Sequence, residues 1–354
     1  MAAGTNRVYV RNIPIGGGAP VTVQSMTNTD TADADRTAEQ ILRFEKAGCD
    51  IARFSVYNEA CFKAIPAIRA KTHIPLVADV HFDHTLAIGA IENGIDKLRI
   101  NPGNIGGRAN VEKLADCAKA HHVPIRIGVN GGSLEKDLKP LYATDPARAM
   151  VESALRHVRM LEDAGFYDIV ISLKSSGVAA TVQAYRLLSQ TVQYPLHIGI
   201  TETGSVSRGI IKSAAGIGAL LLDGIGDTLR VSLTDDPVRE VETGLEILRA
   251  LRLRNDDVEI VSCPTCGRTR VDLMAAVDRI NRELPHNKGY LRVAVMGCAV
   301  NGPGEASDAD IGIAFGSGNG VLFRSGVKFA AGDAEDMIRL LVQTASQMLA
   351  DKEL

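Results

Sequence analysis

Short apolar, β-branched segments alternate with longer segments of helical periodicity over the first 250 or so residues of the chain. Eight of the short segments are typical of buried strands, and the stretches between them are long enough for the helices that parallel strands require. The expected strands are Val21–Met26, Ile51–Val56, Leu76–Val80, Lys97–Asn101, Ile125–Asn130, Ile169–Lys174, Leu196–Thr201 and Leu229–Thr234. Eight strand–helix units predict an α/β TIM (β/α)8 barrel, with a doubly wound open sheet as the alternative.

The helix after Asp145 is the best marked of the intervening segments. Asp145 supplies an N-cap, and Pro146 occupies the first helical position, where its missing N–H costs nothing. Apolar residues then recur at helical spacing until Gly165, which suits the left-handed position after a helix. The sequence therefore predicts a helix that begins at residue 146 and lays one apolar face against the sheet.

The pattern changes after Leu253. The polar run 254–257 is typical of a linker, and a Cys-Pro-Thr-Cys turn follows at 263–266. The expected elements beyond it are a helix over Arg270–Glu283, strands at Leu291–Met296, Ile311–Phe315 and Val321–Phe323, and a helix over Asp333–Leu349. Mixed elements in about 100 residues predict a small α+β domain. We expect a barrel domain over residues 1–254 and a second domain over 255–354.

Composition narrows the class of protein. With 39 basic and 42 acidic residues the net charge is −3, which excludes the strong basic field of a general nucleic-acid binder. Aromatic residues make up 4% and Trp is absent, so base-stacking surfaces are not expected. The longest apolar run, from Ala214 to Leu222, is too short to span a bilayer, and the first residues do not resemble a signal peptide. We expect a cytoplasmic protein with no membrane partner and with reduced cysteines.

Polar side chains share one face of the expected barrel strands. Side chains alternate across a strand, so Arg99 and Asn101 oppose Leu98 and Ile100. The same alternation places a set of polar residues inside the barrel, since the apolar faces must meet the helices. The basic members are Arg53, Lys97, Arg99, Arg126, Lys174 and Arg230, the one acid is Asp79, and the others include His81, Asn130, Ser172, His197, Thr201 and Ser232.

Six buried cations with one acid would cost several kcal/mol each, unless water or a ligand compensates them. A polyanion is the simplest compensation, because guanidinium groups bind phosphate oxygens in pairs. The alternative is that these residues lie at exposed strand ends. His81 and His197 are expected in the site, and the other six histidines on the surface or on helices. Glu202 follows the seventh strand, either as an acid near a helix start or as a proton donor.

The cysteines give the sharpest chemical signal. Cys263 and Cys266 can chelate one centre from a tight turn, and Cys298 follows a strand in a glycine-rich loop that ends at Glu305. Three thiolates suit either zinc or an iron–sulfur cluster. Zinc would need a fourth ligand such as His286, whereas a cluster iron could take another ligand or stay open. The other three cysteines, Cys49, Cys61 and Cys117, are expected as core thiols.

Several motifs resemble the bacterial two-domain form of the 4-hydroxy-3-methylbut-2-enyl diphosphate synthase family, which acts in the non-mevalonate isoprenoid pathway. The resemblance covers nearly the whole chain. The motifs are Arg11–Gly18, Val23–Thr31, Asp79–Phe82, Leu98–Asn104, Ile198–Glu202, Ser262–Thr269 and the loop from Cys298 to Glu305.

The resemblance implies a 4Fe-4S cluster on Cys263, Cys266, Cys298 and Glu305. It implies reductive ring opening of 2-C-methyl-D-erythritol 2,4-cyclodiphosphate, in which two electrons are taken up and one hydroxyl leaves as water. Glu202 would supply the proton. The residues implied to bind the substrate are Arg53, His81, Arg99, Asn101, Arg126, Asn130, Lys174, His197, Thr201, Arg230 and Ser232.

The same resemblance implies a head-to-tail homodimer and flavodoxin or ferredoxin as the electron donor. Two other classes of protein remain open. One is a phosphate- or pterin-binding TIM-barrel transferase with a structural zinc domain. The other is a non-catalytic redox or metal-carrying protein, which would not explain the basic residues of the lumen.

Overall fold

The computed structural model describes residues 4–298 and 308–352, and the chain divides into two compact units, Met1–Arg254 and Asn255–Leu354. In the part of the chain that is described, no helix has the length and apolar character needed to cross a membrane. Each unit has its own apolar core, and each is considered by itself below.

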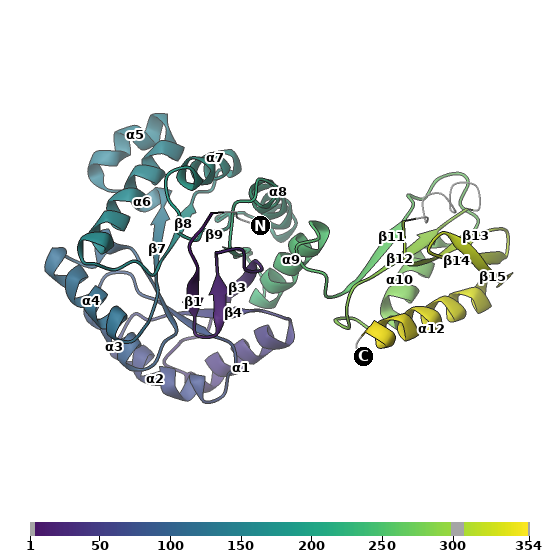
Figure 1. Ribbon diagram of the computed structural model, residues 1–354, viewed down its shortest axis with the longest axis horizontal. Helices are drawn as coiled ribbons and strands as arrows, with labels where there is room; N and C mark the ends of the chain where they lie inside the picture. The colour runs from purple at the N-terminus through teal and green to yellow at the C-terminus, as the bar shows by residue number, and fades with distance from the viewer. Residues whose placement is uncertain (1–3, 299–307, 353–354) are drawn as a thin grey trace. The chain divides into compact units, whose positions relative to one another are not determined.

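Eight parallel strands form the inner layer of the first unit, and helices surround them (Figure 1). The strands are β3 (Thr22–Met26), β4 (Ile51–Ser55), β5 (Leu76–Asp79), β6 (Lys97–Ile100), β7 (Ile125–Asn130), β8 (Ile169–Lys174), β9 (His197–Ile198) and β10 (Thr228–Leu229). The helices are α1 (Ala34–Lys46), α2 (Glu59–Arg69), α3 (His84–Glu92), α4 (Arg108–Ala120), α5 (Lys139–Thr144), α6 (Pro146–Asp163), α7 (Val178–Ser189), α8 (Val206–Leu222) and α9 (Pro237–Ala250).

The strand order closes the sheet into a barrel. It runs β8-β7-β6-β5-β4-β3-β10-β9, and a parallel bridge between Ile171 and Leu196 joins the two ends. The predicted TIM barrel is therefore confirmed, and the open sheet is wrong. The last two strands are shorter than expected. Strand β9 ends at Ile198, and the next residue, Gly199, lies so close to the segment after β10 that a Cβ there would meet the Arg230 carbonyl oxygen at 2.5 Å.

Local sequence signals explain where the best-marked helix, α6, begins and ends. The Asp145 side chain accepts a hydrogen bond from the Arg148 amide at 3.0 Å, and Pro146 occupies the first turn. Gly165, with φ of 67°, adopts the left-handed conformation after the last turn. The apolar stripe, which includes Met150 and Leu161, is buried against the barrel, as the helical spacing predicts.

A short antiparallel hairpin that the sequence pattern did not predict precedes the barrel. Its strands are β1 (Val8–Val10) and β2 (Ile13–Ile15). Val10 and Ile15 are fully buried and form a small apolar cluster with Ile51 of β4 and Val77 of β5, near the amino ends of those strands. The hairpin therefore provides an apolar floor at the amino-terminal end of the barrel.

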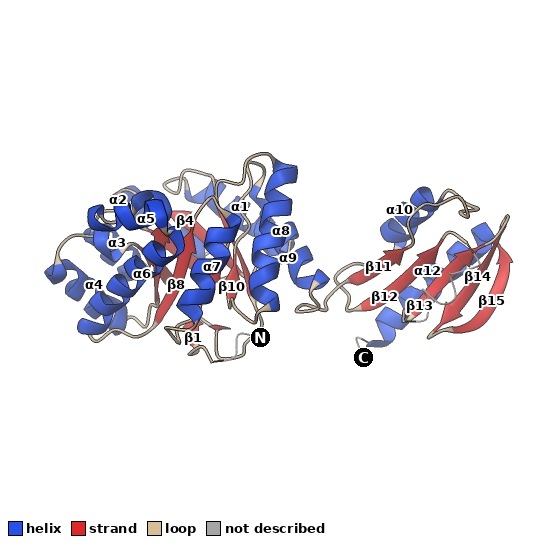
Figure 2. Ribbon diagram, turned by 90° about the horizontal axis from the view of Figure 1, so that it is seen from above, coloured by secondary structure: helices blue, strands red, loops and turns tan. Residues whose placement is uncertain are grey.

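The second unit is a five-stranded sheet with helices on one face (Figure 2). The strands, in sheet order, are β11 (Val258–Ser262), β12 (Leu291–Met296), β13 (Ile311–Phe315), β14 (Asn319–Arg324) and β15 (Val327–Asp333), with helices α10 (Leu273–Glu283) and α12 (Ala334–Lys352). The first three strands are parallel, and the last two are antiparallel to their neighbours. Strands β11 and β15 were not expected.

Tyr185 of α7 strengthens the weakest part of the barrel. Strands β8 and β9 meet only at an isolated bridge, and the buried Tyr185 hydroxyl lies between them. It accepts a hydrogen bond from the Leu173 amide at 2.9 Å and donates one to the His197 carbonyl at 2.5 Å. Burial raises the pKa of Tyr185, so the hydroxyl keeps the proton that it donates.

Replacing Tyr185 by Phe is expected to lower the free energy of unfolding by about 1–3 kcal/mol, because a buried amide and a buried carbonyl lose their partner. Urea unfolding monitored by circular dichroism measures this change. Tyr167→Phe is the matched control, since that side chain is 62% exposed and its loss should leave the unfolding midpoint unchanged. Equal midpoints for both variants would contradict the bridging role of Tyr185.

Candidate active site

The predicted basic side chains of the barrel are buried in its lumen. Arg53, Lys97, Arg99, Arg126 and Lys174 are between 0% and 9% exposed. Arg126 of β7 donates to Oε1 of Gln24 on β3 at 3.3 Å. These two strands are four places apart in a ring of eight, so this hydrogen bond crosses the lumen. The structure thus places these cations inside the barrel rather than at exposed strand ends.

Asp79 of β5 anchors two of the guanidinium groups. Its carboxylate accepts a hydrogen bond from Arg99 at 3.0 Å and lies 3.8 Å from Nε of Arg53. Burial alone would raise the pKa of Asp79, but the two guanidinium groups hold it well below its usual range. Asp79 is therefore ionised at neutral pH, and it fixes the orientation of both arginines while part of each guanidinium remains open to the lumen.

Glu240 on α9 is a second buried acid, which the strand pattern could not predict. It is 3% exposed, and its carboxylate binds Arg230 through Nε at 3.1 Å and Nη2 at 3.0 Å. It also accepts hydrogen bonds from the Ser25 hydroxyl and the Leu233 amide. The sequence pattern did not predict Glu240, because only the strand faces were considered and this acid comes from a helix. Its only sequence signal is a charge on the apolar stripe of that helix.

The sulfur of Met26 contacts two of the arginines in the lumen. Arg53 donates to Sδ of Met26 from Nε at 3.1 Å and from Nη2 at 2.9 Å, and Arg230 lies 3.8 Å from the same sulfur. Burial lowers the pKa of Arg53 to about 9, in competition with Asp79, which raises it. Sulfur is a weak acceptor, so Arg53 keeps most of its capacity to bind an anion.

The uncharged residues predicted for the site lie nearer the carboxyl ends of the strands. Asn101 is buried, and its side-chain oxygen accepts from the Gly103 amide at 3.0 Å, which holds the loop after β6. His81 is half exposed, and its imidazole lies 3.6 Å from Asp79. Three others are partly buried on the neighbouring strand ends and loops: Asn130, Thr201 and Ser232.

Glu202 is exposed on the loop after β9, in an unusual backbone conformation. Its φ is 54°, the left-handed region, which costs a residue with a Cβ of the order of 1 kcal/mol. The next residue, Thr203, is buried, and its hydroxyl donates to the Ser232 carbonyl at 2.8 Å. This hydrogen bond ties the loop after β9 to the segment after β10, and it holds Glu202 at the barrel mouth.

Two histidines differ from the others. His197 is fully buried in the lumen, where its Nδ1 lies 3.3 Å from the Thr228 hydroxyl. His157 was expected on the surface or on a helix; it lies on α6 but is 2% exposed, with its Nε2 3.1 Å from Glu135. Burial lowers the pKa of His157, against the opposing effect of Glu135. The His157 ring packs against Gly103, so closely that a Cβ at that position would meet its Nε2 at 2.6 Å.

The cysteine loops of the second unit meet at the carboxyl ends of two parallel strands. Cys263 follows β11, and its sulfur accepts a hydrogen bond from the Gly297 amide at 3.3 Å, directly before Cys298. The Arg270 amide donates to the Gly297 carbonyl at 3.0 Å. Hydrogen bonds from Arg268 lower the pKa of the exposed Cys266 thiol, which favours the thiolate.

The three thiols do not form a metal-binding group by themselves. Over residues 4–298 and 308–352, no group of three or more His, Cys, Asp or Glu side chains could hold a metal ion. Thiolates repel each other, and metal ligands commonly converge only around the metal. The donor set nevertheless fits a soft metal centre, since all three sulfurs come from two adjoining loops. Glu305, the expected fourth ligand, lies outside the described residues.

His286 cannot complete a zinc site with these cysteines. Its ring contacts Asp257 at 3.0 Å and the Asn281 carbonyl at 2.7 Å. Asp257 directly precedes β11, whereas Cys263 directly follows it, so the strand separates them by roughly 20 Å. The remaining cysteines behave as expected of core thiols: Cys49 and Cys61 are buried, and Cys117 is partly buried on α4.

Both units match models of one protein family. Residues 5–245 match the GcpE TIM-barrel domain, and residues 259–347 match the GcpE protein C-terminal domain. Curated relatives named 4-hydroxy-3-methylbut-2-en-1-yl diphosphate synthase (flavodoxin) are similar over their full length. The relative from Caldanaerobacter subterraneus is 53% identical over 98% of both chains. The relative from Geobacter sulfurreducens is 53% identical over 99% of this chain and 100% of its own.

Solved structures add a similarity of fold. Dihydropteroate synthase from Stenotrophomonas maltophilia has a TM-score of 0.54 at 14% identity and covers 70% of this chain and 97% of its own. The enzyme from Yersinia pestis has a TM-score of 0.51 at 16% identity, over 70% of this chain and 99% of its own. At such identity the likeness shows the barrel fold alone, so it does not favour a pterin-binding transferase. The family models and the full-length relatives agree, and the chain belongs to the GcpE family.

Proposed function

We propose that this protein converts 2-C-methyl-D-erythritol 2,4-cyclodiphosphate to (E)-4-hydroxy-3-methylbut-2-enyl diphosphate by reductive ring opening. The observation that carries the proposal is the excess of buried basic side chains in the lumen of a barrel whose family relatives are named as this synthase. The reaction takes up two electrons and protons, breaks the ring C–O bond to one phosphate and releases one hydroxyl as water. The protein is therefore an oxidoreductase.

The cyclic diphosphate matches the lumen in charge. Each of its phosphorus atoms carries one ionised oxygen, so the substrate is a dianion at neutral pH. Arg53, Arg99 and Arg230 each have one side held by Asp79, Met26 or Glu240, and the other side would bind phosphate oxygens. Arg126 would supply charge from deeper in the lumen, and Lys174 from the carboxyl end of β8. The remaining substrate contacts that we propose are His81, Asn101, Asn130, His197, Thr201 and Ser232.

Glu202 is our candidate for the proton donor to the departing hydroxyl. It lies at the barrel mouth, and its left-handed backbone is retained at the cost of strain, which is common at functional positions. The hydrogen bond from Thr203 to the Ser232 carbonyl would keep the carboxyl group oriented toward the substrate. A carboxylic acid in this position could donate a proton directly to the leaving oxygen.

Cys263, Cys266 and Cys298, together with Glu305, would hold a 4Fe-4S cluster. Such a cluster supplies electrons one at a time at low potential. In this chain, the amide of Gly297 would stabilise the charge on the Cys263 sulfur, and Arg268 would do the same for Cys266. Flavodoxin or ferredoxin would deliver the electrons, as the relatives' name indicates for flavodoxin.

The proposed assembly is a head-to-tail homodimer. In this arrangement the C-terminal domain of one copy covers the barrel mouth of the other. Two-fold symmetry permits it, because each copy contributes one barrel and one cluster domain to two identical sites. The cluster ligands and the residues that bind the substrate would then come from different chains.

Anaerobically purified protein with a chemical reductant is expected to convert the cyclodiphosphate to the allylic diphosphate, and Arg99→Gln should raise KM about 10- to 100-fold. This follows because a charge-assisted hydrogen bond is worth about 1.5–3 kcal/mol. Product formation measured by chromatography tests both statements. Arg108→Gln is the matched control, an exposed arginine on α4 that pairs with Glu112. Unchanged kinetics in Arg99→Gln would contradict binding of the diphosphate by Arg99.

The cluster predicts about four iron and four acid-labile sulfide per chain in the anaerobic protein. Cys298→Ser should lose most of this iron, whereas Cys117→Ser, on α4 of the barrel, should retain it. Glu305→Ala should keep part of the iron and lose turnover, because three thiolates remain. Zinc in place of iron in the unmodified protein would refute the cluster, and full activity in Glu305→Ala would exclude the carboxylate from the mechanism.

If the C-terminal domain of one copy covers the barrel of the other, two different inactive variants should restore activity when they form a mixed dimer. Cys298→Ser lacks a cluster ligand and Arg126→Ala lacks a substrate contact, so each homodimer should be inactive. A mixed dimer would contain one site with both parts intact, and activity should recover to as much as about one quarter of the unmodified level. The measurement is turnover after mixing, with subunit exchange verified by native mass spectrometry. Exchange without recovery would contradict this assembly.

A further inference from the structure

Four polar side chains occupy the lumen of the barrel with unpartnered nitrogen atoms. They belong to Gln24 on β3, Lys97 on β6, Arg126 on β7 and His197 on β9, and none is more than 1% exposed. The atoms without a hydrogen-bond partner are Nε2 of Gln24, Nζ of Lys97, Nε and Nη2 of Arg126, and Nε2 of His197. Such atoms are costly unless a ligand or water binds them, so they mark a place built for an acceptor.

Within the part of the chain that the structure describes, Lys97 lacks a carboxylate partner, unlike three of the arginines of the lumen. Arg53 and Arg99 have Asp79, and Arg230 has Glu240, whereas no carboxylate pairs with Lys97 among the described side chains. The charged groups that act on it electrostatically are Arg126 and Arg53, and Lys97 in turn acts on His197. An ammonium group at this position would therefore be desolvated, unpaired and close to other cations.

Loss of a proton removes this unfavourable charge at the lowest cost in free energy. Among these groups, the lysine amine is the one suited to lose it. Guanidinium groups keep their protons because they are far more basic. Burial, followed by repulsion from Arg126 and Arg53, lowers the pKa of Lys97 well below its usual value. Burial also lowers the pKa of His197, whose imidazole is a much weaker base and stays neutral. An anion that enters the lumen would favour the protonated form again, and it would do so first at the Lys97 amine.

We propose that Lys97 is a proton-linked part of the anion site: its amine is neutral in the ligand-free barrel and takes a proton from solvent when a dianion enters the lumen. Only the identity of the natural dianion rests on the proposed function. One N–H bond forms, so the charge of the protein groups in the lumen rises by one. The anion brings two negative charges. Lys97 would thus act as a positioning residue that matches the charge of the lumen to its ligand.

Proton uptake has a measurable signature. If the ligand binds more tightly to the protonated form, affinity falls as pH rises, by up to about tenfold per pH unit for one proton. Sulfate and the cyclodiphosphate are suitable probes, since both remain dianions across neutral pH. Inorganic pyrophosphate is unsuitable, because it titrates in this range itself. Calorimetric titration of the full-length, anaerobic protein in buffers of different ionisation enthalpy then gives the number of protons taken up.

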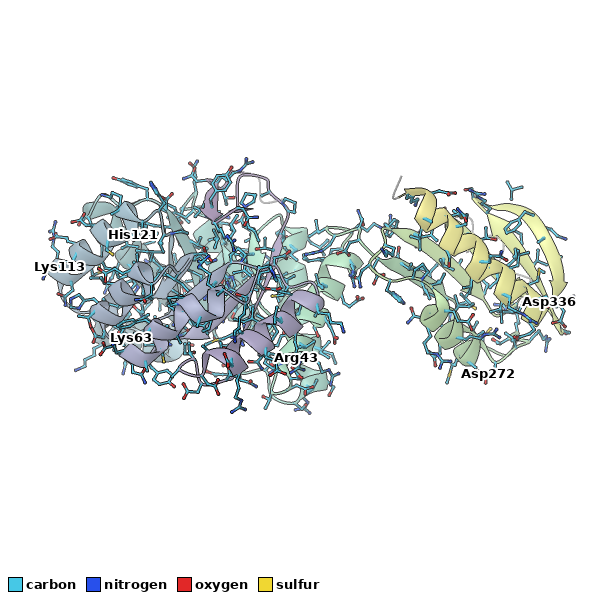
Figure 3. The ribbon with its side chains drawn as sticks, turned by 90° about the horizontal axis from the view of Figure 1, so that it is seen from below. Arg43, Lys63, Lys113, His121, Asp272 and Asp336 are labelled. Carbon is cyan, nitrogen blue, oxygen red and sulfur yellow. The ribbon has the colours of Figure 1, made fainter. Side chains whose placement is uncertain are left out.

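We expect uptake approaching one proton for each bound sulfate or cyclodiphosphate in the unmodified protein. Lys97→Met should remove most of this uptake and flatten the pH dependence of affinity. The matched control is Lys113→Met, an exposed lysine on α4 at the outer surface of the barrel, which should take up as many protons as the unmodified protein (Figure 3). If Lys97→Met does not fold, Lys97→Gln or Lys97→Arg, whose guanidinium stays charged, replaces it.

The outcomes separate the two proposals. Binding of either dianion without proton uptake, or the same uptake in Lys97→Met as in the unmodified protein, would overturn the role of Lys97 and leave the proposed function standing. Sulfate binding with proton uptake but no binding of the cyclodiphosphate would support Lys97 and overturn the proposed substrate. Residual uptake in Lys97→Met would be assigned to other groups such as Lys174, whose pKa burial also lowers.

Discussion

The central constraint on this barrel is an imbalance of buried charge. Its lumen holds four arginines and two lysines against two carboxylates, Asp79 and Glu240. An ordinary barrel of this fold fills the same volume with branched apolar side chains. Keeping cations there costs stability in the free protein, and that cost is recovered only when an anion enters. The lumen is therefore organised for a ligand rather than for its own stability.

The surrounding structure makes this arrangement tolerable. The hairpin of β1 and β2 packs Val10 and Ile15 against Ile51 and Val77 at the amino end of the barrel. Each carboxylate holds a guanidinium by one edge and leaves the other edge available. Tyr185 strengthens the sheet where β8 and β9 barely pair. The outer helices supply an apolar core that extends all around the barrel and offsets the cost of the charged lumen.

Much of the barrel could be predicted from the sequence because its strands obey a strict period of two. The alternation in residues 97–101 indicated which side chains lie inward, and burial of Arg99 and Leu98 on opposite faces agrees with it. Glu240 was missed because it reaches the lumen from a helix, which the strand period does not describe. Strands β1, β2, β11 and β15 are short or lie at an edge, so their pattern is weak. The left-handed backbone of Glu202 has no signal in residue type.

The cysteines of the second unit lie beside its apolar core, at the ends of β11 and β12. This core joins α10 and α12 to one face of the sheet through residues such as Val293, Ile313 and Leu341, all fully buried. Cys263 packs against the edge of this core, whereas Cys266 is exposed on the loop after β11. The hydrogen bond from the Gly297 amide to the Cys263 sulfur holds the two cysteine loops near each other, as the proposed cluster would require. Gly297 shows how closely they approach, since a Cβ at that position would meet the Thr269 side chain at 3.0 Å.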